Sequence, residues 1–441
     1  MRFAVVGGGL LGMTTAWNLV KAGHQATIFE AAPDCGGLAS AWQLGEVVWD
    51  RHYHVTLFSD LTLRALLQEL ALERDLRWVT AQTGFYVDGA LYPFSSALDY
   101  LRFPPLSPVQ KLRLGSTILR AARITDWRPL EHVTAAEWLT RLSGRATFER
   151  IWLPLLRAKL GPNAERASAA FIWAIIARMY GARRTGSKRE LFGYVRGGYQ
   201  RTLRRFEREL RLRGVEIRTS SPVKRVEPLG EGITVVTEGR ADRFDRAVVT
   251  LAPPLAARLC PTLTAEERAL CQGVEYQGII CASLLLDNPL TPYYITNIAD
   301  ASIPFTAVIE MTALVDRNEL GGKALVYLPK YVSVNDPAFA LEDRTIEESF
   351  LSALERMHPT FSRKSVQAFR VSRVPYVFPI PTLGYSDRLP PMRTATRGLF
   401  MASSAHIVNG TLNVNETVGL ANRLTPELLA EPMRSSGAAV A

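Results

Sequence analysis

The stretch Phe3-Ala-Val-Val-Gly7-Gly8-Gly9-Leu10-Leu11-Gly12 determines how the start of this chain folds. Its four leading residues form a short apolar run typical of a buried strand. Gly7, Gly9 and Gly12 then follow at the spacing G-x-G-x-x-G. In this pattern the first glycine makes a tight turn, the second lets the backbone approach a pyrophosphate, and the third lets a helix pack closely on the strand.

A helix is expected directly after these glycines, from about Leu10 to Ala22, with Gly23 ending it. The first N–H groups of such a helix, starting at Leu10 and Leu11, have no partner within it and lie at the positive end of its dipole. The motif therefore predicts that these groups face the diphosphate of a dinucleotide.

Two more signals follow at the spacing that a bound dinucleotide needs. A second strand is expected over residues 25–29, and Glu30 ends it. A carboxylate at this position accepts hydrogen bonds from both ribose hydroxyls and repels a 2′-phosphate. Gly36-Gly37 comes shortly afterwards. The three signals together favour FAD, whereas the first motif alone would also suit an NAD enzyme.

Length and composition limit the classes of protein to which the chain can belong. A chain of 441 residues with 47% hydrophobic content predicts two or three domains. The four cysteines are scattered without a C-x-x-C pair, which argues against a disulfide framework, a metal site or a redox-active dithiol: Cys35, Cys260, Cys271 and Cys281. We expect no signal peptide ahead of the first strand, and no apolar run reaches about 18 residues. A cytoplasmic protein is the simplest interpretation.

The net charge of +10 is concentrated between Arg183 and Arg213. A basic surface attracts nucleic acid, anionic lipid or an acidic substrate. No nucleic-acid-binding motif accompanies the charge, so we predict a solvated helix face and no nucleic-acid partner.

Four separated motifs give the chain its resemblance to a known family. They are the first glycine fingerprint with Glu30, the pair Gly36-Gly37, the run Arg196-Gly197-Gly198-Tyr199, and the apolar run 398–405. With these motifs in this order, the chain resembles the superfamily of FAD-dependent amine oxidases, protoporphyrinogen oxidases and phytoene desaturases. The resemblance implies an α/β fold, with a Rossmann-type FAD domain of the glutathione-reductase-like kind and an inserted α+β substrate domain.

In that superfamily the FAD domain is assembled from discontinuous segments. The resemblance implies that residues 1–58, 190–258 and 390–430 form it here. Residues 59–189 and 259–389 would form the substrate domain, with a helical subregion, and residues 431–441 a flexible tail.

The resemblance also assigns binding roles. Gly7, Gly9 and Gly12 would cradle the pyrophosphate and Glu30 would bind the adenosine ribose. The remaining binding positions are Gly36, Gly37 and Leu38 along the diphosphate and ribityl chain, Val223 with its backbone toward the adenine, and Asn413 and Val414 at a helix start aimed at the flavin C2 carbonyl.

Two positions depart from the family pattern. Leu38 stands where many relatives carry an arginine, and Ser403-Ser404 stands where relatives carry Gly-Asp. A hydroxyl still donates to a phosphate oxygen, so these serines remain candidates for cofactor binding. The same departure also suggests a flavoprotein without catalysis.

Three histidines are the candidates for a catalytic role. His52 and His54 would share one face of a strand near the flavin, and His406 follows the last predicted strand. Hydrogen-bonded structural histidines are the alternative. Asn409, Asn413 and Asn415 would either contact the flavin or cap the last helix.

The resemblance implies an oxidoreductase that takes a hydride from a CH–NH or CH–CH unit of a small-molecule substrate to flavin N5. His52-Tyr53-His54 and residues 89–94 also resemble UDP-galactopyranose mutases, which use reduced FAD without net redox change, but the arginine-rich terminal motif of that family is replaced by residues 411–416.

Residues 107–124 predict a basic amphipathic helix. Such a helix either presents a solvated face or docks on an anionic membrane as a peripheral contact. The sequence leaves both interpretations open, and it leaves the oligomeric state unknown.

Overall fold

The computed structural model describes residues 1–182, 191–408 and 411–430. Segments far apart in the chain form a five-stranded parallel sheet with the order β10-β2-β1-β14-β20. The strands are β1 (Arg2–Val6), β2 (Gln25–Phe29), β10 (Glu216–Arg218), β14 (Arg246–Val249) and β20 (Leu399–Met401). This sheet confirms the predicted fold class, because its strands come from the three regions that hold the family motifs.

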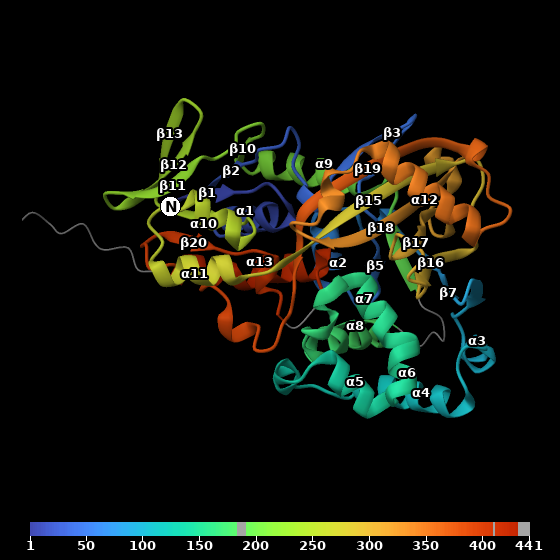
Figure 1. The fold of residues 1–441 in the computed structure, drawn as a ribbon. Coiled ribbons are helices and arrows are strands. Elements are labelled where there is room, and N and C mark those ends of the chain that lie inside the picture. Colours follow the sequence, from blue (N-terminus) through green and yellow to red (C-terminus); the bar gives the residue numbers. More distant parts are fainter. Residues whose placement is uncertain (183–190, 409–410, 431–441) are drawn as a thin grey trace, which may run out of the picture.

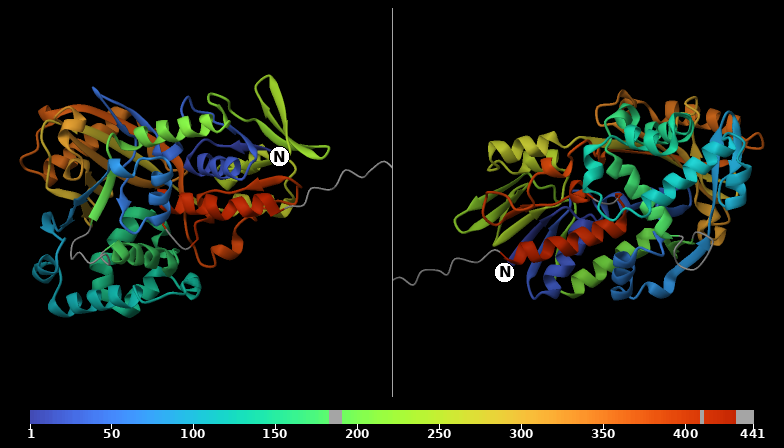
Figure 2. Two further views of the ribbon diagram at one scale, coloured as in Figure 1. Left: turned by 180° about the vertical axis from the view of Figure 1, so that it is seen from behind. Right: turned by 90° about the horizontal axis from the view of Figure 1, so that it is seen from below.

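Apolar side chains alternate between the two faces of this sheet. Phe3 and Val5 of β1 pack under a layer of helices, whereas Ala4 and Val6 pack toward a small antiparallel sheet. The helical layer consists of α1 (Leu10–Lys21), α2 (Leu61–Glu69), α9 (Gly198–Leu212) and α13 (Val414–Ala430), of which α1, α9 and α13 run side by side in Figure 2. The opposite layer consists of β11 (Arg225–Leu229), β12 (Gly232–Thr237), β13 (Arg240–Phe244), α10 (Pro253–Leu259) and α11 (Ala265–Gly273).

A second, seven-stranded sheet lies beside the first (Figure 1), with the order β19-β15-β18-β17-β16-β7-β8. Its elements are β7 (Gln82–Val87), β8 (Ala90–Pro93), β15 (Tyr276–Leu286), β16 (Tyr293–Ile298), β17 (Ala307–Glu310), β18 (Ala324–Ser333), β19 (Val366–Pro379) and the covering helix α12 (Asp343–Met357). Asp88 and Gly89 form the turn of the hairpin between β7 and β8, and both have positive φ. The sheet is mixed, because β7 pairs in parallel with β16, whereas its other strand pairs are antiparallel.

The predicted helical region packs around the indoles of Trp138, Trp152 and Trp173. Its helices are α3 (Ala97–Arg102), α4 (Pro108–Ala121), α5 (Ala135–Ser143), α6 (Arg145–Thr147), α7 (Leu153–Leu160) and α8 (Ala169–Ala182). Figure 1 shows this region extending away from both sheets, with α4 along its outer edge.

Short strands join these parts. They are β3 (Ala41–Leu44) with β4 (Val47–Asp50), and β5 (Thr56–Leu57) with β9 (Leu191–Val195) and β6 (Leu76–Thr80). The domain boundaries stay a prediction, as does the tail, which lies outside the described residues. Helix α2, placed by that prediction in the substrate domain, packs in the same apolar cluster as α1 and α13.

Candidate functional site

The glycine loop after β1 leaves the start of α1 open. Gly7, at φ +113°, turns the chain while its N–H donates to the Phe29 carbonyl over 2.8 Å. Gly9 is the N-cap residue of α1, with no side-chain cap and no acidic residue in the first turn. The first N–H groups of α1, from Leu10 onward, are thus left without a side-chain acceptor, which is the arrangement that binds a diphosphate.

The second glycine pair lies directly against this loop. The Gly36 N–H donates to the Gly8 carbonyl over 2.8 Å, and Gly9 and Gly36 form an isolated parallel bridge. A Cβ added to Gly9 would meet only the Gly37 Cα, at 4.0 Å. The chain's own packing therefore leaves room at Gly9, so its glycine serves the approach of another group. This cradle fits the diphosphate of FAD.

Glu30 lies beside the same loop. Its Oε2 accepts from the Gly8 N–H over 2.7 Å and its Oε1 from the Ala32 N–H over 2.8 Å. Each carboxylate oxygen keeps a lone pair for a ribose hydroxyl. The Ser221 N–H donates to the Glu30 carbonyl over 2.8 Å, which brings the loop carrying half-buried Val223 to this edge of the sheet.

Gly8 is a site residue that the sequence prediction omitted. A Cβ there would lie 2.8 Å from the Cys35 Sγ and 2.9 Å from the Glu30 Cβ. Glycine at this position thus lets Glu30 reach the loop. The sequence signal for Gly8 was the run of three consecutive glycines from Gly7 to Gly9. The G-x-G-x-x-G motif requires glycine only at the first and third of these positions.

The third motif is anchored by another residue that the sequence did not single out, Asp50. Its Oδ1 accepts from the Tyr199 N–H over 2.7 Å at the start of α9, and a Cβ on Gly198 would lie 2.8 Å from that oxygen. Burial raises the pKa of Asp50 to about 7. This hydrogen bond therefore holds the end of β4 against the Gly197-Gly198 turn, next to Leu38 and His52.

His52 and His54 do not lie on a strand, which corrects the sequence prediction. They lie in the irregular segment between β4 and β5. Because the Leu38 carbonyl can only accept, His52 Nδ1 donates to it over 3.1 Å, and Nε2 accepts from the Ser372 hydroxyl over 3.1 Å. Burial lowers the pKa of His52 to about 4. A neutral His52 therefore positions Leu38 and the double-glycine turn.

His54 differs from His52 in having an unused ring nitrogen. Its Nδ1 is buried and has no hydrogen-bond partner within the described residues, and its ring lies 4.9 Å from that of Tyr199. Burial lowers the pKa of His54 to about 4, so the imidazole is neutral near pH 7. Its Nδ1 is one of fourteen buried side-chain atoms without such a partner in the described part of the chain. The His54 nitrogen can accept a hydrogen bond from a bound group.

The segment after β20 is internally hydrogen-bonded. Ser403 Oγ accepts from the Ala405 N–H over 3.2 Å, and Ser404 Oγ lies 3.3 Å from the Tyr276 hydroxyl. His406 Nδ1 accepts from the Ser403 N–H over 3.1 Å, and Nε2 donates to the Pro390 carbonyl over 3.0 Å. Both ring nitrogens of His406 are thus occupied, which favours the structural alternative for this histidine. Catalysis by His406 and cofactor binding by the serines stay predictions.

The asparagines at the start of α13 act mainly within the protein. Asn413 Oδ1 accepts from the Glu416 N–H over 3.1 Å, as a helix N-cap does, and Asn415 Oδ1 accepts from the Leu63 N–H over 3.1 Å. Val414 is buried at the start of the helix. Asn409 lies outside the described residues. The contact of this helix start with a flavin stays a prediction.

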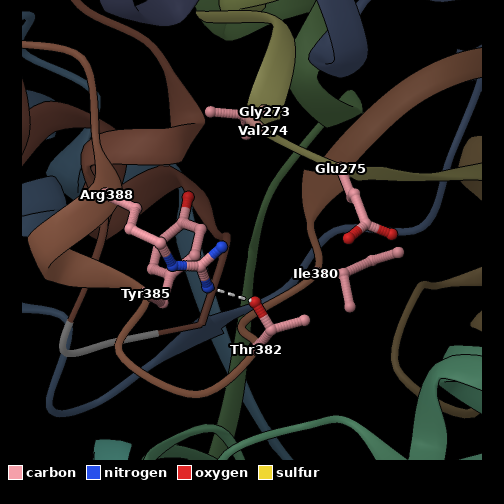
Figure 3. A pocket seen from close by; sticks show the side chains of 7 residues that line it. All are labelled: Gly273, Val274, Glu275, Ile380, Thr382, Tyr385 and Arg388. Carbon is pink, nitrogen blue, oxygen red and sulfur yellow. Dashed lines mark hydrogen bonds between the residues drawn. The ribbon is translucent and has the colours of Figure 1, made fainter. Parts of the chain in front are cut away.

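The pocket shown in Figure 3 borders the segment after β20 but holds none of the predicted site residues. Arg388 Nη2 donates to the Thr382 hydroxyl over 2.6 Å, and Arg166 pairs with Glu275. The Tyr385 hydroxyl donates to the Ala405 carbonyl over 2.8 Å. These interactions occupy the polar groups around it, so we place no chemistry there.

Comparison with known proteins identifies the family that this geometry suits. Residues 12–414 match the family described as flavin containing amine oxidoreductase. The chain belongs to this family. Membership confirms the predicted resemblance and the predicted class, a family of oxidoreductases that carry a flavin, and it supports FAD as the cofactor.

Two curated relatives of this flavin-containing family represent different chemistries. Zeta-carotene desaturase from Synechocystis is 26% identical over 267 residues, covering 54% of this chain and 52% of that protein. Amine oxidase A from Bos taurus is 27% identical over 294 residues, covering 63% and 54%. The chain spans about half the length of the curated relatives it matches.

Solved structures share the fold over almost the whole chain. An oxidoreductase from Methanosarcina mazei has a TM-score of 0.76 and 18% identity, covering 97% of this chain and 100% of that chain. Reduced UDP-galactopyranose mutase has a TM-score of 0.73 and 15% identity, covering 97% and 93%. At these identities the likeness establishes the fold alone. Each helix in the described part of the chain is too short or too polar to cross a membrane.

Proposed function

We propose that this protein oxidises a CH–NH or CH–CH unit of a small organic substrate, and that oxygen or another acceptor receives the electrons. Bound FAD supplies the chemistry, by accepting a hydride at N5. The observation that carries the proposal is the unpartnered His54 Nδ1, on the segment where His52 holds Leu38 beside the glycine turn. Desaturase and amine oxidase relatives support both bond types.

The chain's own residues have separate tasks in this proposal. The glycine turns and Glu30 hold the diphosphate and the ribose. His52 fixes the Leu38 segment in place, and His54 offers a neutral nitrogen to the group that occupies the site. The Tyr53 hydroxyl lies 2.9 Å from the Tyr331 hydroxyl of β18, which links this segment to the seven-stranded sheet.

The first experiment is spectroscopic. The purified protein is expected to be yellow, with flavin bands near roughly 370 and 450 nm. Anaerobic mixing with a panel of amines and polyenes should bleach the longer-wavelength band, and admission of air should restore it. Turnover of a nucleotide sugar only after prior reduction, without net electron transfer, would favour the mutase alternative. A flavin that no compound reduces would favour a non-catalytic flavoprotein.

His54 provides a variant test of this proposal. We expect His54→Ala to lower kcat/KM about 10- to 100-fold, the effect of one lost hydrogen bond to a buried polar group. His54→Asn places an amide near the Nδ1 position and should recover most of the rate. Because the pKa of His54 is lowered to about 4, its ionisation should leave kcat/KM unchanged between pH 6 and pH 8. Initial rates at equal flavin content measure this, and an unchanged rate in His54→Ala would remove His54 from the proposal.

We also propose that the outer face of α3 and α4 contacts anionic lipid. Five large apolar side chains are exposed within this short region: Leu98, Leu101, Val109, Leu112 and Leu119. On α4, Val109 and Leu112 are three residues apart and Leu119 follows seven later, so they share one face. Exposed Arg113, Arg120 and Arg123 accompany them. An exposed apolar stripe flanked by basic residues is typical of interfacial helices.

Vesicle sedimentation tests this membrane contact. We expect the protein to sediment with vesicles containing phosphatidylserine, and Leu112→Glu to reduce the bound fraction about fivefold, because a leucine side chain contributes about 1.5–3 kcal/mol when buried. Leu341→Glu is the matched control, since Leu341 is also exposed but lies far along the chain, just ahead of α12. Equal sedimentation of both variants with the parent protein would refute the contact.

A further inference from the structure

Two cations approach each other where the helical region meets the seven-stranded sheet. Lys159 lies near the end of α7 and Arg178 on α8, and the charge of Arg178 contributes to the lowered pKa of Lys159. Asp60 pairs with Arg178 over 3.1 Å, and its side chain is only 5% exposed. The Asp60 carboxylate therefore offsets the charge of Arg178, and among the described residues Lys159 has no carboxylate of its own. An uncompensated positive charge in a largely buried region is costly unless an anion joins it.

Lys159 has no hydrogen-bond or ion-pair partner among the residues that the structure describes. Instead its Nζ lies over two aromatic faces, 5.6 Å from the ring centre of Tyr331 and 5.5 Å from that of Phe378. Phe171 stacks on Phe378 with an interplanar angle of 8°. Lys159, Tyr331 and Phe171 are each only half-buried. The ammonium group of this half-buried lysine is thus flanked by two aromatic faces.

Arg178 also retains unused binding capacity. Its Nη2 donates to Asp60, and its Nη1 lies 3.4 Å from the Thr411 hydroxyl, close to the start of α13. Its Nε is buried and has no partner within the described part of the chain. A guanidinium binds a carboxylate through paired N–H groups, so Arg178 can share an anion with Lys159.

This cluster connects to the candidate site through hydrogen-bonded aromatic residues. Tyr331 carries the hydroxyl that lies 2.9 Å from Tyr53, and Tyr53 is adjacent in sequence to His52 and His54. The cluster therefore lies on the substrate side of the segment that contacts the glycine turn.

We propose that the substrate is a carboxylate with a planar apolar body, that Lys159 and Arg178 bind the carboxylate, and that the half-buried rings of Tyr331 and Phe171 contact the body. The proposal rests on the oxidoreductase function above and narrows its substrate class. A simple cationic amine is disfavoured, because Lys159 and Arg178 would repel it. A neutral hydrocarbon would leave the Lys159 charge without a partner.

Equilibrium dialysis of the FAD-loaded protein tests this assignment without requiring turnover. Benzoate and benzamide have the same shape and differ in charge. We expect benzoate to bind about 10- to 100-fold more tightly, the effect of a charge-assisted hydrogen bond. Lys159→Met keeps the unbranched stem and should remove most of this preference, whereas Lys159→Arg should restore it to within about threefold. Lys364→Met, at an exposed lysine, is the control that should keep the preference.

The pH profile separates charge recognition from a merely structural lysine. Burial and the neighbouring Arg178 lower the pKa of Lys159 to about 8, so the protonated form is lost as pH rises through that value. The pKa of Tyr331 is raised to about 12 and that of Tyr53 is raised further, so neither hydroxyl ionises in this range. Arg178 is the charged group that acts on Lys159, and Asp60 is the ion-pair partner of Arg178. The preference for benzoate should therefore decline between pH 7 and pH 10, and it should persist in Lys159→Arg.

Three results would overturn the proposal. The first is a holoenzyme that binds benzoate no more tightly than benzamide, or that binds neither. The second is a preference for benzoate that is unchanged in Lys159→Met. The third is a preference for benzoate that is unchanged up to pH 10. Failure of the proposed oxidoreductase function would give a different result, namely a flavin that no amine or polyene reduces. The two failures are therefore distinguishable.

Discussion

Replacing Gly9 by alanine is expected to produce a folded but colourless protein. The φ of Gly9 is −69°, which any residue adopts, and the added Cβ would meet only the Gly37 Cα at 4.0 Å. The apoprotein should therefore keep its thermal midpoint, since changes that touch nothing alter stability by about 0.5 kcal/mol or less. The same methyl group fills the space through which the backbone approaches the diphosphate. We expect FAD affinity to fall about 100-fold or more, which corresponds to about 2.7 kcal/mol.

Gly12→Ala is the matched control, because the same added methyl group should destabilise the folded apoprotein at that position. A Cβ on Gly12 would lie 1.9 Å from the Gly7 carbonyl oxygen. The loop or α1 must move, at a cost of about 1–3 kcal/mol for overpacking. Gly12→Ala should therefore lower the thermal midpoint of the apoprotein, whereas Gly9→Ala should not. Flavin absorbance after FAD reconstitution, with thermal unfolding of the apoprotein, measures both effects. Normal FAD content in Gly9→Ala would contradict the cradle.

The features that could be predicted from the sequence are those that neighbouring residues determine. The strand before Gly7, the helix after it and the strand ending at Glu30 follow from short apolar runs and glycine positions. The strand at residues 399–401 lies within the apolar run 398–405, and it joins the same sheet by pairing with β14. These elements together gave the correct fold class and the correct cofactor.

The features that were missed depend on contacts between distant parts of the chain. His52 was expected on a strand, but its ring is held by the Leu38 carbonyl and by Ser372, which lies 320 residues away. No local pattern reveals such a partner. Lys159 likewise gained its significance only when β18 and β19 brought Tyr331 and Phe378 beneath it. Sheet pairing among β15, β18 and β19 decides these neighbours.

Glu30→Arg is expected to abolish FAD retention while the chain remains folded. The substitution removes the acceptor of the Gly8 and Ala32 N–H groups, which lie 2.7 and 2.8 Å from the carboxylate. It also replaces the group that would accept from the ribose hydroxyls with a longer cation that only donates. Glu30 is only half-buried, so the lost hydrogen bonds should cost about 1–3 kcal/mol of stability in total. Circular dichroism should show a native spectrum, and the flavin absorbance should be absent.

Glu30→Gln separates the charge from the hydrogen bonds. The amide oxygen still accepts from one of the two N–H groups, and the side chain keeps its length. We therefore expect a yellow protein whose affinity for FAD is reduced about 10-fold, between the parent protein and Glu30→Arg. The measurement is the dissociation constant from titration of each apoprotein with FAD. Full flavin occupancy in Glu30→Arg would show that the ribose is held elsewhere, because no other acceptor would then remain at this position of the loop.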